Sequence, residues 1–280
     1  MPKARSAQFN PAKAKQKFYR KVLWWLAAAI GCLSAICAVS LAKAASLDET
    51  AEQYRPRLIE GIGKALSGAQ ALRERVAAKD LRGAKAAWIS ARAGWERFEV
   101  FTAGFVPELD EKIDAWPNAT AGFHAIEASL FGANRTDVDA EASALVEHLA
   151  DLERKAHELP LTPQGLLNGT ARLAYEVGEN KSDGGESRIS GTSLDDIHNN
   201  VIGIEIAYDV VFSPAIGSAD PALADTARRQ IEQLKALLDV SSLNKVDTSK
   251  LRRVTEEFVV TLQSAALKIG LARPSLESGL

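Results

Sequence analysis

Apolar residues recur at every third or fourth position along most of the chain after Ala44, and this periodicity constrains the fold more than any other feature. In the first such stretch the recurring residues are Leu47, Ala51, Tyr54, Leu58, Ile62, Leu66, Ala69, Leu72 and Val76. This spacing places side chains on one face of an α-helix, whereas a half-buried strand would alternate apolar and polar residues. No segment shows a convincing alternation. The sequence therefore predicts an all-α protein.

Prolines, glycines and polar runs divide the periodic region into about eight helices. We expect these helices over about residues 47–78, 81–105, 119–131, 136–159, 163–179, 193–212, 221–238 and 248–271. Pro56 should kink or restart the first helix, Pro107 should end the second, and the Gly- and Ser-rich run Asn180–Thr192 is typical of a loop. Short connectors between helices favour antiparallel bundles. We expect one bundle or two four-helix bundles, over about residues 45–160 and 161–275.

The first 44 residues differ from the remainder of the chain. They contain eight Lys and Arg residues and no acid, and Val22–Ala42 is an uncharged run behind the basic segment. Ala42 and Ala44 are small residues at the positions that a signal peptidase reads, which predicts cleavage after Ala44. The run is also long enough to remain as a membrane anchor. Lipidation at Cys32 is a weaker third option, because the leucine usual before such a cysteine is missing.

Charge and cysteine content limit what residues 45–280 can bind. They hold 26 basic and 36 acidic residues, so that their formal net charge is about −10, which argues against non-specific nucleic-acid binding. Cys32 and Cys37 are the only cysteines and Met1 is the only methionine. The exported part therefore has no disulfide, no thiol nucleophile and no sulfur ligand. Any metal ion must be held by oxygen and imidazole groups.

Acidic and histidine side chains repeat at helical spacing in the region most suited to chemistry. Glu96 and Glu99 are three residues apart, and so are His124 and Glu127, so each pair can share a helix face. If the two helices face each other, their side chains converge, with Asp114 available from the connector between them. Such a mixed oxygen and nitrogen set suits a divalent or trivalent metal ion.

A simpler interpretation makes Glu96 and Glu99 ordinary surface charges. Arg92 lies one helical turn before Glu96 and could form a surface ion pair with it, worth a few tenths of a kcal/mol. The neighbouring Trp95 and Phe98 are core-like, which favours a position near a helix interface. Buried carboxylates without a partner are costly, so a cation among them is the more economical explanation.

Several ordered motifs resemble the EfeO/EfeM family of the imelysin-like group, which is marked by a His-x-x-Glu motif. The resemblance covers roughly Tyr54–Ile216. The motifs that carry it are LRGAKA at 81–86, ARAGWERFE at 91–99, LDEKID at 109–114, GFHAIE at 122–127 and GESRIS at 185–190, followed by Asp195, Asn200, Gly203 and Tyr208.

The resemblance implies an all-helical periplasmic protein of a bacterial iron-uptake system. Its expected partners are an inner-membrane iron permease and a haem peroxidase-like protein, with membrane contact only through the N-terminal segment. The metal site of the family maps onto Glu96, Glu99, Asp114, His124 and Glu127, with Asp110 and Glu186 as further acidic positions. Iron, as Fe(II) or Fe(III), is the expected ion, and zinc or manganese would compete for the same ligands. The chain would be a short form, without the cupredoxin domain of longer members.

Two other function classes remain open at this stage. A metal-dependent peptidase of the imelysin-like group would use a metal-bound water, but the usual zinc-protease motif of two histidines four residues apart is absent, as is a Gly-x-Ser-x-Gly motif. A non-catalytic envelope protein would carry Glu and His on ordinary solvent-exposed surface. We therefore expect a binding protein rather than an enzyme.

Overall fold

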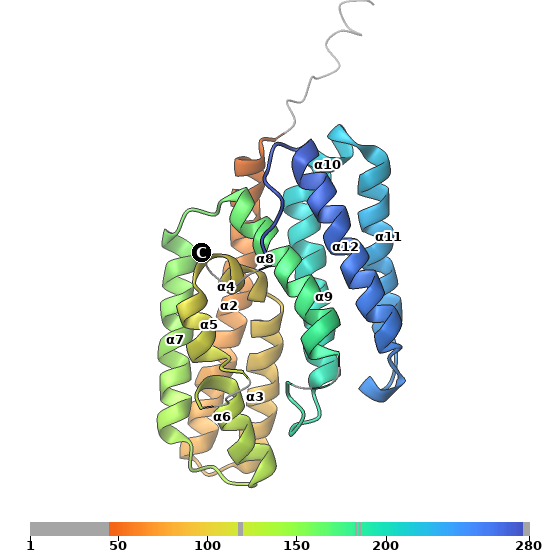
Figure 1. Ribbon diagram of the computed structural model, residues 1–280. Coiled ribbons are helices and arrows are strands. Elements are labelled where there is room, and N and C mark those ends of the chain that lie inside the picture. The colour runs from red at the N-terminus through yellow and green to blue at the C-terminus, as the bar shows by residue number, and fades with distance from the viewer. Residues whose placement is uncertain (1–44, 117–119, 183, 185, 277–280) are drawn as a thin grey trace, which may run out of the picture. The chain divides into compact units, whose positions relative to one another are not determined.

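Three long helices, α2 (Leu47–Ala77), α3 (Leu81–Glu96) and α7 (Asp139–Glu158), run side by side on one side of the computed structural model (Figure 1). The structure describes residues 45–116, 120–182, 184 and 186–276. The expected signal or anchor segment Val22–Ala42 lies outside these residues. Helices, and no strand, make up the secondary structure of the described part. The all-α prediction is confirmed.

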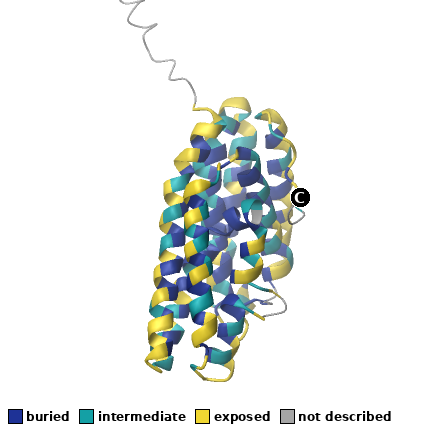
Figure 2. Ribbon diagram, turned by 90° about the vertical axis from the view of Figure 1, so that its left-hand side faces the viewer, coloured by how far each residue is buried: buried dark blue, intermediate teal, exposed yellow. Residues whose placement is uncertain are grey.

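A second group of helices packs against the first. It contains α8 (Pro163–Glu176), α9 (Ser193–Ala207), α11 (Pro221–Leu238) and α12 (Thr248–Lys268), and Figure 1 shows α8 and α9 between the first group and the α11–α12 pair. The π-helical turn η3 (Tyr208–Phe212) and α10 (Ser213–Ala219) continue α9 without interruption. Residues 45–280 form one compact unit. The main apolar cluster draws on both groups, and buried residues follow their inward faces (Figure 2).

Side-chain caps fix where most long helices begin. Ser46 forms a capping box with Glu49 before α2, and Asp80 accepts a hydrogen bond from Gly83 N at the start of α3. Thr162 caps α8 in the same way, with Pro163 at the first position. These groups satisfy amide N–H groups that have no partner inside the helix. Starts at Pro163, Ser193, Pro221 and Thr248 agree with the sequence-based boundaries.

Pro56 does not restart the first helix as the sequence suggested. Helix α2 continues from Leu47 to Ala77 with Pro56 inside it. The flanking Tyr54 and Leu58 are fully buried, and Arg55 donates to the carbonyl oxygens of Ala156, in the last turn of α7, and of Leu159, directly after it. Packing on two neighbouring helices offsets the loss of one backbone hydrogen bond at the proline.

The helix expected over residues 81–105 is broken, and this correction matters most for the site. Helix α3 ends at Glu96, and α4 (Glu99–Phe105) begins after a turn at Arg97 and Phe98. A Cβ at Gly61 of α2 would lie 1.7 Å from the Phe98 ring, and one at Gly203 of α9 would lie 2.2 Å from the Arg97 carbonyl oxygen. The turn therefore fits only because two helices distant in sequence approach it with glycine.

Short helices replace several segments that the sequence treated as one element or as a connector. The acidic connector 108–118 contains most of α5 (Pro107–Ile113), so Pro107 begins a helix as well as following one. The helix expected over 119–131 consists of α6 (Gly122–Glu127) and the π-helical turn η1 (Ala128–Gly132). Another π-helical turn, η2 (Val177–Lys181), extends α8 into the predicted loop, and the single turn η4 (Leu243–Lys245) precedes α12.

The run Ser193–Ala219 is long and apolar enough to cross a membrane by length and composition alone. Within the described part of the chain, however, α9 packs against α3, α8 and α11. It also buries Asp196 and Asn200 on the side that faces the centre of the protein. Its apolar character is therefore that of a core helix.

Candidate metal centre

His124 lies at the start of α6, where a glycine sets the path of the backbone. Gly122 has φ +63°, and a Cβ there would lie 2.0 Å from the Ile113 carbonyl oxygen. This places His124, which is 1% exposed, against the end of α5. Its Nδ1 lies 3.3 Å from Glu127 Oε2, and its Nε2 lies 3.1 Å from Asp114 Oδ1 without hydrogen-bond geometry. The His-x-x-Glu motif thus brings imidazole and carboxylate together, and Asp114 joins them.

Asp114 is the residue that follows α5, and it is held by α3. Trp95 Nε1 donates to Asp114 Oδ2 at 2.9 Å, and Arg92 donates to Asp114 Oδ1 at 2.5 Å. Burial raises the pKa of Asp114, but Arg92 and His124 outweigh it and hold that pKa well below its usual range. Asp114 is therefore an ionised carboxylate at neutral pH, in place beside the imidazole.

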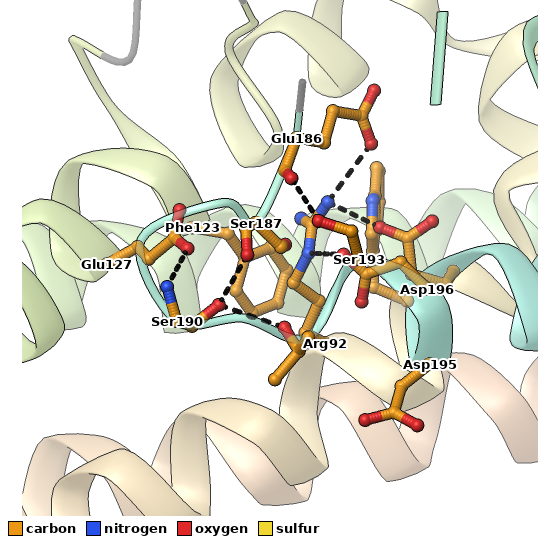
Figure 3. A network of polar contacts seen from close by, with 12 residues as sticks. Arg92, Phe123, Glu127, Glu186, Ser187, Ser190, Ser193, Asp195 and Asp196 are labelled. Atoms are coloured by element: carbon orange, nitrogen blue, oxygen red, sulfur yellow. Dashed lines mark hydrogen bonds and ion pairs between the residues drawn. The ribbon is translucent and has the colours of Figure 1, made fainter. Parts of the chain in front are cut away.

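Arg92 is the centre of the charge cluster and was not predicted as a site residue. Its side chain is 1% exposed and contacts four carboxylates, those of Glu96 (2.6 Å), Asp114 (2.5 Å), Asp196 (2.9 Å) and Glu186 (3.3 Å). Figure 3 shows the guanidinium between Glu186 and Asp196. The surface pair that the sequence allowed for Arg92 and Glu96 is in fact buried, so the estimate of a few tenths of a kcal/mol does not apply to it.

Lys181 is a second buried cation, 3% exposed, which η2 directs into the cluster. Its Nζ lies 2.8 Å from Glu99, 3.0 Å from Glu96 and 3.1 Å from Glu186. No sequence pattern pointed to this residue, because it falls in the run that was predicted to be a loop. Its position depends on the way η2 extends α8 by one wide turn.

Asn200 of α9 completes the surroundings of Glu96 and Glu99. Its side-chain amide donates to Glu96 Oε2 at 2.8 Å and to Glu99 Oε2 at 2.9 Å. The same amide also donates to the Glu96 backbone carbonyl at 2.8 Å, a group that the break in the helix leaves without an intrahelical partner. Asn200 and Gly203, both singled out in the sequence, therefore support the turn that separates Glu96 from Glu99.

The loop from Glu186 to Thr192 closes over the cluster. The Ser190 backbone N–H donates to Glu127 Oε1 at 2.7 Å, and Ser193 Oγ donates to the Glu186 carbonyl oxygen at 2.5 Å (Figure 3). Ser187, which is fully buried, has φ 40°, a conformation that a non-glycine residue adopts only when its surroundings enforce it. The loop thereby fixes Glu127 and Glu186 relative to α9.

A cavity of about 620 Å³ borders the cluster, and its lining is mostly acidic. It is lined by Glu99, Asp110, Asp114, Trp116, Arg172, Glu176, Glu179, Asn180, Glu186 and Arg188. Trp116 is 44% exposed, and its ring centroid is 5.1 Å from that of His124. Asp110 accepts a hydrogen bond from Thr102 Oγ1 at 3.0 Å and lines the cavity without touching His124 in any contact that the structure describes.

The described cluster contains more carboxyl groups than cations. Its acids are Glu96, Glu99, Asp110, Asp114, Glu127, Glu186 and Asp196, and its permanent cations are Arg92 and Lys181. Burial raises the pKa of Asp110 and of Glu186 to about 7 and that of Asp196 to about 6. Burial also raises the pKa of Glu99 well above its usual range. The cluster therefore takes up protons at neutral pH, in positions where a metal cation could take their place.

Three of these groups have the geometry of a metal site. Asp114, His124 and Glu186 each offer a ligand atom within 4.8 Å of one another, and we call them the triad. Burial lowers the pKa of His124, but Asp114 and Glu127 outweigh it and raise that pKa to about 9. The protonated imidazole of His124 therefore occupies the position of a metal ligand, and its Nε2 has no hydrogen bond. Oxygen and imidazole ligands of this kind suit Fe, Mn or Zn.

The residues predicted from sequence divide into two groups. His124, Asp114 and Glu127 contact one another, and Glu186 joins the first two in the triad. Glu96 and Glu99 both contact Lys181 and Asn200, and Glu96 also contacts Arg92. Arg92, Lys181 and Asp196 were missed. Asp195, which the sequence motif had included, is exposed, and its neighbour Asp196 is buried against Arg92.

Comparison with known proteins agrees with the motifs. The sequence model of a family described as imelysin matches residues 51–120 and 117–257, a span that contains every residue of the cluster. The chain is 29% identical over 206 residues to an Efem/EfeO family lipoprotein of Staphylococcus haemolyticus (strain JCSC1435), covering 70% of this chain and 71% of that protein. Lipoproteins of the same description from Staphylococcus aureus strains MRSA252 and NCTC 8325 / PS 47 match at the same identity, with 72% of each covered.

Proposed function

Because the chain belongs to the imelysin family, we propose that it binds a metal cation at Asp114, His124 and Glu186 and carries it as cargo, without transforming it. One observation carries the proposal. A buried cluster rich in carboxyl groups places two carboxylates and an imidazole within reach of a single ion, beside an acidic cavity. Glu127 contacts His124 Nδ1 and Ser190 N. It would orient the imidazole so that Nε2 faces the metal.

Iron is the cargo that the resemblance to the EfeO/EfeM family favours. Carboxylate and imidazole ligands accept Fe(II) and Fe(III), but they also accept Zn(II) and Mn(II), so the ligand set alone does not select iron. Delivery would be to an inner-membrane iron permease, with a haem peroxidase-like protein as a second partner. Both partners are inferred from the family resemblance, and neither is needed for the binding test below.

Export from the cytoplasm is part of the proposal. The matched staphylococcal relatives are described as lipoproteins, and the uncharged run Val22–Ala42 follows a basic segment in this chain. Mass spectrometry of the protein purified from its native cells distinguishes the three forms. Cleavage after Ala44, a lipid on Cys32 and an intact N-terminus each give a different mass.

The structure also bears on the peptidase alternative. A metalloprotease requires a free general base next to its metal-bound water. Glu127 is the acid of the motif, but one of its oxygens contacts His124 and the other accepts a hydrogen bond from Ser190 N. This arrangement favours binding over hydrolysis. Chelator-sensitive cleavage of a peptide library by the purified protein would instead support the peptidase.

The binding test compares His124→Ala with His198→Ala. His198 is exposed on α9 and contacts no member of the cluster, so it controls for the loss of a histidine. Titration of metal-free protein with Fe(II) under anaerobic conditions, and with Mn(II) in air, should give one site in the wild type and in H198A. We expect H124A to lose affinity by about a hundredfold, the effect of deleting one strong ligand. Equal affinity in H124A and wild type would remove the triad as the site.

A further inference from the structure

Lys181 occupies a position that resembles a cation site itself. Its ammonium lies within 3.1 Å of Glu96, Glu99 and Glu186, and the side chain is 3% exposed. A buried lysine would ordinarily lose its proton, but these three acids outweigh the effect of burial, and its pKa is raised well above the usual value. Three carboxyl groups within 3.1 Å of Nζ therefore favour the charged ammonium.

Glu186 is shared between Lys181 and the triad. A single oxygen of this residue, Oε2, lies 3.1 Å from Lys181 Nζ and 3.3 Å from Arg92. A cation that binds Asp114, His124 and Glu186 must attract the same carboxylate while two positive charges lie beside it. Repulsion between charges a few ångströms apart in a buried site is large compared with thermal energy.

Arg92 and Lys181 differ in how firmly they are held. Arg92 contacts four carboxylates and lies over the rings of Trp88 and Phe123. Lys181 has a flexible stem and lies at the end of η2, directly before the loop that carries Glu186 and directly after Asn180, which lines the cavity. Of the two cations, Lys181 is the one that can move without disturbing α3.

We propose that the Lys181 ammonium competes with the cargo cation for the carboxylate of Glu186. The ammonium holds Glu186 in the cargo-free protein and gives up this carboxylate when a cation binds the triad, which keeps the affinity of the site low enough for release to a partner. The proposal rests on the function proposed above. It assigns Lys181 a positioning role, because the lysine acts on the cargo through Glu186 and does not touch it.

The test titrates Mn(II) into metal-free wild type, Lys181→Met, Lys181→Arg and Lys235→Met. Tryptophan fluorescence reports binding, since the Trp116 ring lies against His124 and Mn(II) is paramagnetic. We expect K181M to bind on the order of tenfold more tightly, because one positive charge beside Glu186 is gone. K181R keeps the charge and should remain near wild type. K235M is the matched control, because Lys235 pairs with Glu205 on the surface and its loss changes the net charge equally.

A second measurement uses the wild-type protein and does not depend on the folding of a variant. Acetic anhydride labels lysines at fixed pH, and mass spectrometry quantifies the label at Lys181 and Lys235 with and without Mn(II). We expect saturation with Mn(II) to increase the labelling of Lys181 by severalfold and to leave Lys235 unchanged.

The outcomes separate this inference from the proposed function. Failure of the wild type to bind Mn(II) or Fe(II), or binding that H124A leaves unchanged, overturns the function itself. Binding that depends on His124, together with unchanged or weaker affinity in folded K181M, overturns the competitor role alone. Labelling of Lys181 that stays equal or falls when Mn(II) binds also overturns the competitor role alone. This measurement is sufficient if K181M does not fold.

Discussion

The two halves of the charge cluster both contain buried carboxyl groups in contact with Arg92 or Lys181, and only one of them also contains an imidazole. On one side, Asp114, His124 and Glu186 meet beside the cavity, and the imidazole between them can exchange its proton for a metal. On the other side, Glu96 and Glu99 contact Lys181. Asp114 and Glu186 also contact Arg92, and Glu186 contacts Lys181, so the imidazole rather than a permanent cation distinguishes the two halves. The spacing of carboxylates along the chain does not distinguish these two surroundings.

The largest effect should come from removing the cation that both halves share. Arg92→Met leaves four buried carboxylates without their guanidinium, and breaking a buried ion pair from one side costs about 3–5 kcal/mol. Urea unfolding of metal-free protein at pH 7 measures the loss. Arg228→Met is the control, because Arg228 pairs with Asp209 at a site about 40% exposed, where such pairs contribute about 0–1 kcal/mol. Similar losses in the two variants would contradict the central role of Arg92.

A second experiment tests directly which half holds the cargo. Glu186→Gln removes a charged ligand of the triad and should weaken Mn(II) binding by about 10- to 100-fold. Glu99→Gln should have little effect, because Glu99 contacts Lys181 and Asn200 and lies outside the triad. Isothermal titration measures both. A loss of affinity in E99Q equal to that in E186Q would support the ligand set predicted from sequence, with Glu96 and Glu99 as ligands.

The smallest expected effect is the change in metal affinity for each unit of pH. Metal must displace the proton of His124, whose pKa is about 9, and below pH 7 it must also displace the proton of Glu186, whose pKa is about 7. The association constant for Mn(II) should therefore rise about tenfold per pH unit from pH 7 to 8.5, and more steeply between pH 5.5 and 7. Titrations at half-unit steps measure this slope. A flat profile would mean that the cargo binds away from the triad.

The same pKa shifts predict how the stability of the cargo-free protein depends on pH. His124, Asp110, Glu186 and Asp196 all have a folded-state pKa above the unfolded value. Each then contributes stability that is complete below its unfolded pKa and is lost as pH rises through its folded pKa. Melting temperatures of metal-free protein should accordingly fall by several degrees from pH 5.5 to 9, and saturating metal should reduce the fall. Stability that rises over this range would contradict the assignment.

Much of the fold could be predicted because it depends on local pattern. The long helices follow from apolar periodicity, and Pro163, Pro221 and Asp80 mark their starts. The break between Glu96 and Glu99 could not be predicted in this way. It depends on Gly61, Asn200 and Gly203, which come from α2 and α9 and meet the turn only in the folded protein.

The candidate site was predicted in part for the same reason. The spacing of His124 and Glu127 places their side chains on one helix face, and in the structure they are 3.3 Å apart. Glu186 was named from a motif, and Asp114 from its place in the connector. Lys181 and Asp196 were missed, because a lysine in a polar run and an acid in a first helical turn look like ordinary solvated residues.

The sequence by itself determined the helical class, the acidic charge of the body, the lack of sulfur ligands and the local pairing of His124 with Glu127. Tertiary structure alone decided which cation neutralises each carboxylate. The physical reason is that the charge state and partner of a buried group depend on the groups that packing brings around it, and these come from α3, α9, η2 and the loop after η2. Helical spacing extends over one turn, whereas this electrostatic balance involves residues about a hundred positions apart, such as Arg92 and Asp196.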